Sequence, residues 1–365
     1  MPPGTKWLYL SVMAVCLVFI LEMFFRFLFF RTSFLDKNYV LSDTWWKLNW
    51  MRWQGSDPDK PFFPAGEANY QPDRELGWNL KANLKNHRTG EDTLLSTNSR
   101  GVRGSREYPL ERSGDTDRFV VLGDSFTFGD EVSDQETYSA LLENREQNRE
   151  VVNLGIIGYA HDQMLLKLKT EGVAYKPDLL ILGFLGMDME RNMLSFKDYL
   201  KPSFELKDGQ LMPKYSDIPG EKVFLRREKF KPKTFDFISL IGGRFFSGDR
   251  TLETDRLTAA LLDEILKTAA GIRSDTLLVY LPAGPEISGD EASLGQDFFN
   301  RYCRQTVAKN QYNINCLDLR SRFREEAKKG VVFRGGQTEG HYDRQAHALV
   351  AVEIDEYLKG KGVLK

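Results

Sequence analysis

Five short runs of apolar residues recur along the chain after residue 117. They are RFVVLG (118–123), EVVNLG (150–155), DLLILGF (178–184), TLLVYLP (276–282) and INCLDL (314–319). Because the apolar positions are consecutive and do not alternate with polar ones, each run is typical of a strand buried on both faces of a parallel sheet.

Segments with a helical pattern separate these runs. Ser133 and Glu136 have the spacing of a capping box at the start of DQETYSALLENR. TDRLTAALLDEILKTAAG (254–271) has helical periodicity, and a last helix is expected from about Arg344, with Asp343 as its N-cap. The alternation predicts an α/β fold: a doubly wound, flavodoxin-like, mostly parallel five-stranded sheet with helices on both faces.

The first thirty residues have a different pattern. WLYLSVMAVCLVFIL (7–21) contains no charged residue, and EMFFRFLFF extends the apolar run to Phe30. As a helix, residues 7–30 would span about 36 Å, which is enough to cross a bilayer. Glu22 and Arg26 are four residues apart and can pair on one helix face. We therefore expect an N-terminal transmembrane helix that contacts the membrane through residues 7–30. A cleaved signal peptide is disfavoured because bulky residues follow the run.

A cluster of tryptophans follows this predicted anchor. It consists of Trp45, Trp46, Trp50 and Trp53. Tryptophan concentrates at membrane surfaces, so an interfacial segment is one interpretation. Packing against the soluble domain is the other, and the sequence favours neither.

These patterns predict three parts: an anchor (1–32), a tryptophan-rich stalk (33–69) and a hydrolase-like domain (70–365). An insertion at 196–250 interrupts the strand–helix rhythm. It contains an expected hairpin at Asp208–Gly209 and the basic run RREKFKPK. A surface excursion is favoured slightly over a lid beside the site.

Charge and cysteine content narrow the function classes. The net charge of −2 argues against a nucleic-acid partner. No cysteine or histidine spacing is typical of a metal site, no nucleotide-binding fingerprint occurs, and no cofactor is expected. The sequence favours buried free thiols for Cys303 and Cys316, with a disulfide as the alternative in an oxidising compartment.

The first apolar run leads directly into Gly-Asp-Ser, within VVLGDSFTFG. A serine hydroxyl becomes a nucleophile when an adjacent base takes its proton. Among four histidines, His341 alone has a carboxylate two residues away, that of Glu339. His347 is expected to be structural, and His161 is expected at the surface, with a position at the mouth of the site as the alternative.

These motifs resemble those of the SGNH/GDSL hydrolase superfamily, particularly its membrane-anchored bacterial members. VVLGDSFTFG resembles the nucleophile block, VVNLGIIGYAHDQ the second block and EGHYDRQAHALVA the last block. STNSRGVRG and YKPDLLILGF are also similar to segments of this group. The resemblance implies Ser125 as nucleophile, His341 as base, Glu339 as the acid, and the N–H groups of Ser125 and Gly158 as oxyanion donors.

The chain differs from that pattern in two places. The acid is usually Asp, whereas Glu339 stands here. The third block normally provides an Asn amide to the oxyanion, but GFLGMDMERN places Met187 there, and methionine cannot donate a hydrogen bond. Asn192 is a candidate substitute, and Asp124 and Asp188 are candidates for support.

The sequence thus predicts a membrane-anchored serine esterase or deacylase that acts on a small or glycan O-acyl ester. The resemblance implies a single-pass protein of the bacterial inner membrane with its soluble domain on the periplasmic side. One alternative is an O-acyltransferase of envelope polysaccharide with the same residues. The other is a non-catalytic envelope protein that binds a glycan or a protein partner.

Overall fold

The computed structural model describes residues 3–55, 69–89, 93–112, 114–215, 218–246, 250–288, 294–333 and 340–362. The chain forms two compact units. The first comprises Met1–Pro64, Phe196–Leu200 and Pro219–Arg250, and the second comprises Ala65–Ser195, Lys201–Ile218 and Thr251–Lys365. The insertion at 196–250 therefore contributes to both units.

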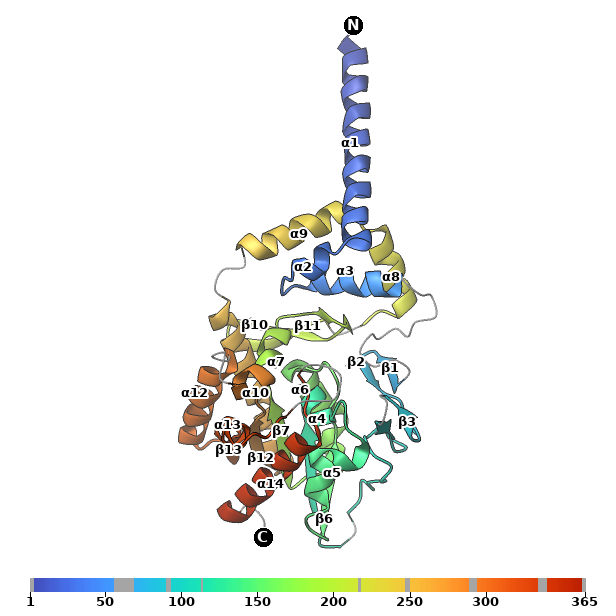
Figure 1. The fold of residues 1–365 in the computed structure, drawn as a ribbon. Coiled ribbons are helices and arrows are strands. Elements are labelled where there is room, and N and C mark those ends of the chain that lie inside the picture. Colours follow the sequence, from blue (N-terminus) through green and yellow to red (C-terminus); the bar gives the residue numbers. More distant parts are fainter. Residues whose placement is uncertain are drawn as a thin grey trace. The chain divides into compact units, whose positions relative to one another are not determined.

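A five-stranded sheet forms the centre of the second unit (Figure 1). Its strands are β5 (Asp117–Leu122), β6 (Arg149–Asn153), β7 (Leu179–Phe184), β12 (Asp275–Tyr280) and β13 (Ile314–Asp318). They lie in the order β13-β12-β7-β5-β6, and every pairing between them is parallel. Counted along the chain, this is the flavodoxin-like order 2-1-3-4-5. The α/β fold predicted from the apolar runs is confirmed.

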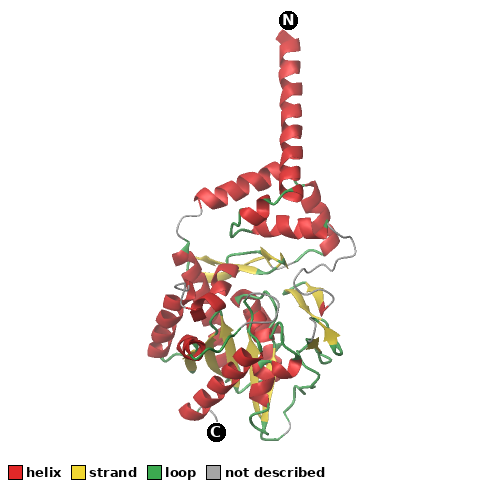
Figure 2. Ribbon diagram, in the orientation of Figure 1, coloured by secondary structure: helices red, strands yellow, loops and turns green. Residues whose placement is uncertain are grey.

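Helices cover both faces of this sheet (Figure 2). On one face, Phe119 and Ile181 pack with residues of α5 (Tyr138–Glu143), α13 (Arg320–Lys328) and α14 (Arg344–Lys361). On the other face, the ring of Phe184 contacts His161 of α6 (His161–Thr170) and Phe298 of α12 (Leu294–Lys309). Helix α10 (Thr251–Gly271) packs beside α6. Successive strand residues point to opposite faces, so continuous apolar runs fill both layers.

The ends of several elements follow the predicted signals. The Asp343 carboxylate caps α14 by accepting the Ala346 N–H at 2.9 Å. Asp208 and Gly209 have φ values of 51° and 76° in the hairpin of β10 (Ser203–Lys207) and β11 (Gln210–Tyr215), as a type I′ turn requires. The helix expected after Ser133 is divided into a 3₁₀ turn, Asp134–Glu136, and α5, because Thr137 between them has an extended backbone.

Shorter elements complete the second unit. They are β1 (Tyr70–Asp73), β2 (Gly77–Leu80), β3 (His87–Arg88), β4 (Leu94–Leu95), α4 (Ser125–Phe128), the 3₁₀ helix Gly172–Tyr175, α7 (Gly186–Arg191) and α11 (Gly284–Ser288).

The first unit contains a helix long and apolar enough to cross a membrane, α1 (Pro3–Arg31). Figure 1 shows α2 (Phe34–Lys37), α3 (Asp43–Gln54), α8 (Glu221–Phe230) and α9 (Lys233–Phe246) at the C-terminal end of α1. The unit also contains β8 (Phe196–Lys197), which contacts α3, and β9 (Tyr199–Leu200). Trp50 is buried against Phe196, Tyr199 and Phe224. This tryptophan therefore packs inside the first unit.

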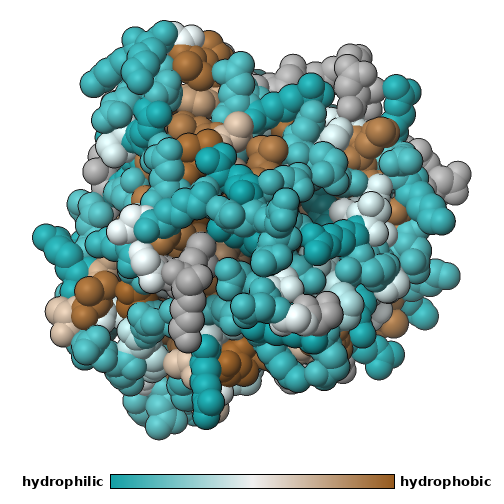
Figure 3. All heavy atoms as spheres, turned by 90° about the horizontal axis from the view of Figure 1, so that it is seen from below, coloured by the Kyte–Doolittle hydropathy of each residue, from teal (hydrophilic) through white to brown (hydrophobic). Residues whose placement is uncertain are grey.

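Exposed apolar side chains are concentrated in α1. Large side chains between Trp7 and Phe27 are more than half exposed at most positions. By contrast, the face of the molecule in Figure 3 is mainly hydrophilic, with small and scattered hydrophobic patches. The exposed apolar surface of the described residues is therefore concentrated on the one helix that is long and apolar enough to cross a membrane.

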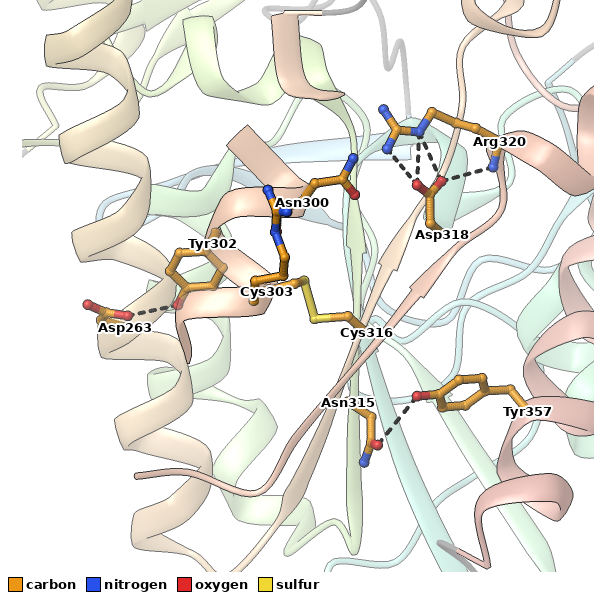
Figure 4. Close-up of a disulfide and its surroundings, with 10 residues drawn as sticks. Asp263, Asn300, Tyr302, Cys303, Asn315, Cys316, Asp318, Arg320 and Tyr357 are labelled. Carbon is orange, nitrogen blue, oxygen red and sulfur yellow. Dashed lines mark hydrogen bonds and ion pairs between the residues drawn. A yellow bond between two sulfur atoms is a disulfide. The ribbon is translucent and has the colours of Figure 1, made fainter. Parts of the chain in front are cut away.

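Cys303 and Cys316 form a disulfide, so the expectation of two free thiols is wrong (Figure 4). Cys303 lies on α12 and Cys316 on β13, and the helix packs on that strand. Their Cα atoms are 6.3 Å apart, within the range that a disulfide bridges.

Candidate active site

Ser125 is the first residue of α4, and only Gly123 and Asp124 separate it from the end of strand β5. Asp124 caps this short helix, and its carboxylate accepts the Phe126 N–H at 3.0 Å. An N–H at the first position of a helix has no intrahelical acceptor. The Ser125 N–H is therefore suited to bind an oxyanion beside the Ser125 hydroxyl.

His341 faces this serine from the loop before α14. Its Nε2 lies 2.9 Å from Ser125 Oγ, although 216 residues separate the two in sequence. The neighbouring Tyr342 holds the loop in place: its hydroxyl donates to the Pro282 carbonyl at 2.9 Å, and its ring packs edge-on against Phe126. The two residues singled out as nucleophile and base are thus in hydrogen-bonding contact.

Two carboxylates approach the other ring nitrogen of His341. Glu131 Oε1 lies 3.4 Å from Nδ1, and Asp130 Oδ2 lies 3.7 Å from it. Neither was among the candidates from sequence. Glu339, the candidate acid, lies outside the residues that the structure describes. The one feature of the sequence that could have pointed to Asp130 and Glu131 is their position as an acidic pair five and six residues after Ser125, in GDSFTFGDEV.

Burial raises the pKa of Glu131, and the charge of Asp130 raises it further. Burial also raises the pKa of Asp130. A positive charge on His341 acts in the opposite direction on both carboxyl groups. A positive charge on His341 therefore favours the ionised form of both carboxyl groups, against the effect of their burial.

Arg103 fixes the loop that carries these acids. Its buried guanidinium donates to three backbone carbonyls, those of Phe128 (2.6 Å), Gly129 (2.7 Å) and Val132 (2.5 Å). Between these anchors, Glu131 has a φ of +73°, a left-handed conformation that non-glycine residues rarely adopt. Arg103 is the last arginine of STNSRGVRG, which gives that motif a structural role.

Three glycines near the C-terminal ends of the central strands leave room for Thr127 of α4 to pack closely on the sheet. Gly123 follows β5, Gly155 comes two residues after β6, and Gly183 is the second-last residue of β7. A Cβ at any of these three positions would lie within about 3 Å of Thr127. The Thr127 hydroxyl in turn accepts from the hydroxyl of Tyr138 at 2.9 Å. This packing was not predicted, although a glycine is the last residue of the first two of these apolar runs and the second-last residue of the third, DLLILGF.

Gly158, which the motif resemblance implies as an oxyanion donor, has a φ of +79° in the turn closed by the Tyr159 N–H and the Ile156 carbonyl. This conformation explains the glycine. Met187 lies on α7 with its side chain 47% exposed, and its thioether has no proton to donate.

The amide of Asn192, the candidate substitute, is engaged elsewhere. It donates to Thr258 Oγ1 at 3.0 Å and lies 3.1 Å from Nδ1 of His161. His161 is fully buried, so the expectation of a surface histidine is wrong. It opens α6 against the ring of Phe184, and burial lowers its pKa to about 3.

The two supporting aspartates share one partner. Arg191 pairs with Asp124 at 3.0 Å and with Asp188 at 2.7 Å, which ties α7 to the nucleophile turn. His347 is buried in the core, where its Nδ1 accepts the Tyr138 N–H at 3.2 Å, as expected of a structural histidine.

This arrangement suits nucleophilic catalysis. With its proton on Nδ1 facing the carboxylates, His341 presents Nε2 to accept the Ser125 proton. Within the described ranges, no group of three or more His, Cys, Asp or Glu side chains has the arrangement of a metal site.

No family model matches the sequence, and no curated protein matches it. Similar solved structures include a lipolytic G-D-S-L family protein from Veillonella parvula DSM 2008, which is 13% identical over 66% of this chain and 98% of that chain, with a TM-score of 0.40. TesA is 16% identical over 68% of this chain and 99% of that chain, with a TM-score of 0.40. A catalytic mutant of Axe2, an acetylxylan esterase from Geobacillus stearothermophilus, is 14% identical over 69% and 97% of the two chains, also with a TM-score of 0.40.

Lipolytic G-D-S-L proteins, the group that the sequence motifs resemble, are thus among the structures similar to this chain. At these identities and scores the similarity says nothing about its chemistry. The interpretation of the site rests on the geometry around Ser125 and His341.

Proposed function

We propose that this chain is a membrane-anchored serine hydrolase that cleaves an O-acyl ester. The observation that carries the proposal is the 2.9 Å contact between Ser125 Oγ and His341 Nε2, with Glu131 and Asp130 at the opposite ring nitrogen. A serine, an imidazole and a carboxylate in this order are the parts that acyl transfer to serine needs.

In the proposed reaction, Ser125 Oγ attacks the ester carbonyl while His341 takes the hydroxyl proton. The tetrahedral oxyanion accepts hydrogen bonds from the N–H groups of Ser125 and Gly158. His341 then gives its proton to the departing alcohol, which leaves an acyl-enzyme on Ser125. A water molecule, deprotonated by His341, attacks this acyl group, and the acid is released as Ser125 recovers its proton.

Glu131 and Asp130 act through His341. A carboxylate at Nδ1 fixes the ring in the tautomer that leaves Nε2 free to accept a proton, and it stabilises the imidazolium that follows. Because their loop is anchored by Arg103, the carboxylates are held in position before substrate arrives.

The substrate class follows from the motif resemblance: O-acyl groups on envelope polysaccharide or on a small ester. Transfer of the same acyl group to a sugar hydroxyl would use the same residues, and a product assay separates the two. With an acetylated glycan and a second glycan as acceptor, hydrolysis releases free acetate, whereas transfer acetylates the acceptor.

We also propose that α1 crosses the inner membrane of a bacterial cell once and that the second unit is exported to the periplasm. The disulfide between Cys303 and Cys316 supports export because disulfides persist in oxidising compartments. A reporter joined after Gly55 tests the orientation. Alkaline phosphatase, which is active outside the cytoplasm, is expected to work there, and activity of a cytoplasmic reporter would contradict export.

Turnover of ester substrates tests the function. The full chain in detergent is assayed with an aryl acetate and an acetylated glycan, beside Ser125→Ala and the matched control Ser105→Ala at an exposed serine. Ser125→Ala is expected to lower kcat about 10³-fold or more, while Ser105→Ala retains activity. Equal turnover by the parent and Ser125→Ala would rule out the mechanism.

A further inference from the structure

The corner between α8 and α9 is bonded to the charged pair of α1. Glu22 and Arg26 pair at 2.8 Å on α1. The Arg26 guanidinium donates to the Lys229 carbonyl at 3.3 Å, and the Glu22 carboxylate accepts the Lys233 N–H at the start of α9 at 2.7 Å. The two helices are therefore fixed to α1 at the level of its charged residues.

This level is also where the continuously exposed part of α1 ends. From Trp7 to Phe24 the large apolar side chains are exposed, whereas beyond them Phe25 and Phe29 are buried within the first unit and Phe27, on another side of the helix, is still 60% exposed. The exposed stretch spans about 27 Å as a helix, close to the roughly 30 Å of a hydrocarbon core. The α8–α9 corner thus meets α1 where the bilayer core would end.

Helix α9 is apolar on two sides. On one side, Phe237 stacks on Phe25 with ring centroids 4.4 Å apart, and Leu240 is buried with it. On the other side, Phe235 and Ile238 are 62% and 60% exposed, and Ile241 continues the stripe at the same three-residue spacing. The first side accounts for the packing of the unit, and the second is left facing outward.

Helix α8 combines exposed apolar and basic residues. Phe230 is 75% exposed, and Val223 lies two turns before it, also exposed. The exposed basic residues of this helix are Lys222, Arg226, Arg227 and Lys229. Basic residues together with exposed aromatic and aliphatic side chains are typical of helices that lie in the surface of an anionic membrane.

We propose that α8 and α9 form an interfacial helix pair, residues 221–246, that lies in the membrane surface beside α1. Phe230, Phe235 and Ile238 enter the boundary between headgroups and acyl chains, and the basic residues of α8 contact anionic phospholipid headgroups. The inference rests on the proposed membrane span. In this proposal, the partner of the exposed apolar residues of the insertion is an anionic lipid surface.

Depth-dependent fluorescence quenching tests this inference with the full chain in vesicles of phosphatidylcholine and phosphatidylglycerol. In a Cys16→Ser background, an environment-sensitive dye is attached in turn to Phe235→Cys and Ile238→Cys. The matched control is Val307→Cys, an exposed apolar position on helix α12 of the second unit. Phe19→Cys, exposed on α1, reports on the span itself.

Dyes at 235 and 238 are expected to be quenched several-fold more than the dye at 307, and most strongly by nitroxide lipids labelled near the headgroup. The dye at 19 is expected to respond most to a nitroxide deep in the acyl chain. Quenching at 19 without quenching at 235 and 238 would leave the span intact and overturn the helix pair. No quenching at 19 would overturn the span and the helix pair with it.

Two further outcomes would also contradict the proposal. Dyes at 235 and 238 that are shielded from aqueous iodide but not quenched by lipid would mean that a second protein copy covers this face. The headgroup contact is tested by Arg226→Glu together with Arg227→Glu. This change is expected to reduce quenching at 235 in vesicles that contain phosphatidylglycerol, and equal quenching in those vesicles would overturn that contact.

Discussion

Nδ1 of His341 lies 3.4 Å from Oε1 of Glu131, while the other ring nitrogen, Nε2, faces Ser125. The loop that follows Ser125 therefore provides a carboxylate for the proposed base, His341. The motif resemblance assigned this role to Glu339, which stands two residues before His341. The two assignments predict different effects on kcat when each acid is replaced.

If the loop acids orient His341, their removal lowers kcat with little change in KM. We expect Glu131→Gln to lower kcat about 10-fold to 10²-fold, since Asp130 remains 3.7 Å from Nδ1. Asp130→Asn combined with Glu131→Gln is expected to approach a 10³–10⁴-fold loss, roughly that of removing a triad acid. Glu339→Gln serves as the matched comparison. A larger loss from Glu339→Gln than from the double variant would return the acid role to Glu339.

Removal of the Arg103 side chain is expected to affect both stability and the acid loop. Arg103→Met leaves three buried carbonyls without their donor and Asp134 without its ion-pair partner, which lies 3.3 Å away. Removing one partner of such a buried ion pair costs about 3–5 kcal/mol. Thermal unfolding in detergent measures the stability, and kcat reports on the loop. Arg103→Lys keeps the charge and is expected to recover part of both. Arg103→Met with the parent's unfolding temperature and kcat would show that the loop does not depend on this anchor.

Two buried histidines are expected to make the fold sensitive to acid. Burial lowers the pKa of His161 and of His347 to about 3, from an ordinary value of 6.5. Because the pKa of each histidine is lower in the folded state, between about pH 6.5 and pH 3 these histidines are protonated in the unfolded chain but neutral in the folded chain. Stability is therefore complete above about pH 6.5 and falls as the pH drops toward 3, by up to about 1.4 kcal/mol per pH unit for each histidine.

The variant that checks this is His347→Gln, whose side-chain oxygen can still accept the Tyr138 N–H. It is expected to lose stability near pH 7 but to show about half of the parent's decline between pH 6 and 4 in thermal unfolding. An unchanged decline would mean that His347 does not contribute to it.

Restoring an amide at position 187 is expected to increase turnover. The loss of one oxyanion donor typically costs about 10²–10³ in kcat, and Met187 provides none. Because this side chain is 47% exposed, Met187→Asn is expected to leave the unfolding temperature nearly unchanged. We expect kcat to rise at least about 10-fold, with Met187→Leu as the control that supplies no donor. A gain of the same size in Met187→Leu would exclude the oxyanion explanation.

The central sheet could be predicted from the sequence because its strands are buried on both faces. Such strands must be apolar at consecutive positions, and a run such as 178–184 becomes β7 within one residue of the expected start. Helix ends that are set by local side-chain contacts could also be predicted from the sequence, as with Asp343 at the start of α14. These signals depend on neighbours within a few residues.

The rest depends on contacts between distant segments. Glu131 contacts His341, which lies 210 residues later in the sequence. The contact also depends on a left-handed backbone conformation at Glu131, which the local sequence does not predict. Cys303 and Cys316 meet only because α12 packs on β13. His161 is buried where α6 packs on the sheet, with its ring against Phe184 of β7. Spacing in the chain carries no information on such encounters.

Labelling with a fluorophosphonate probe tests the central claim most directly. The full chain and Ser125→Ala are treated in detergent, and intact mass with peptide mapping locates the adduct. We predict one equivalent of label on Ser125, none in Ser125→Ala, and a strongly reduced labelling rate in His341→Ala because the base is lost. A folded parent protein that remains unlabelled, or carries the label at another residue, would contradict the claim that Ser125 and His341 form an assembled nucleophile.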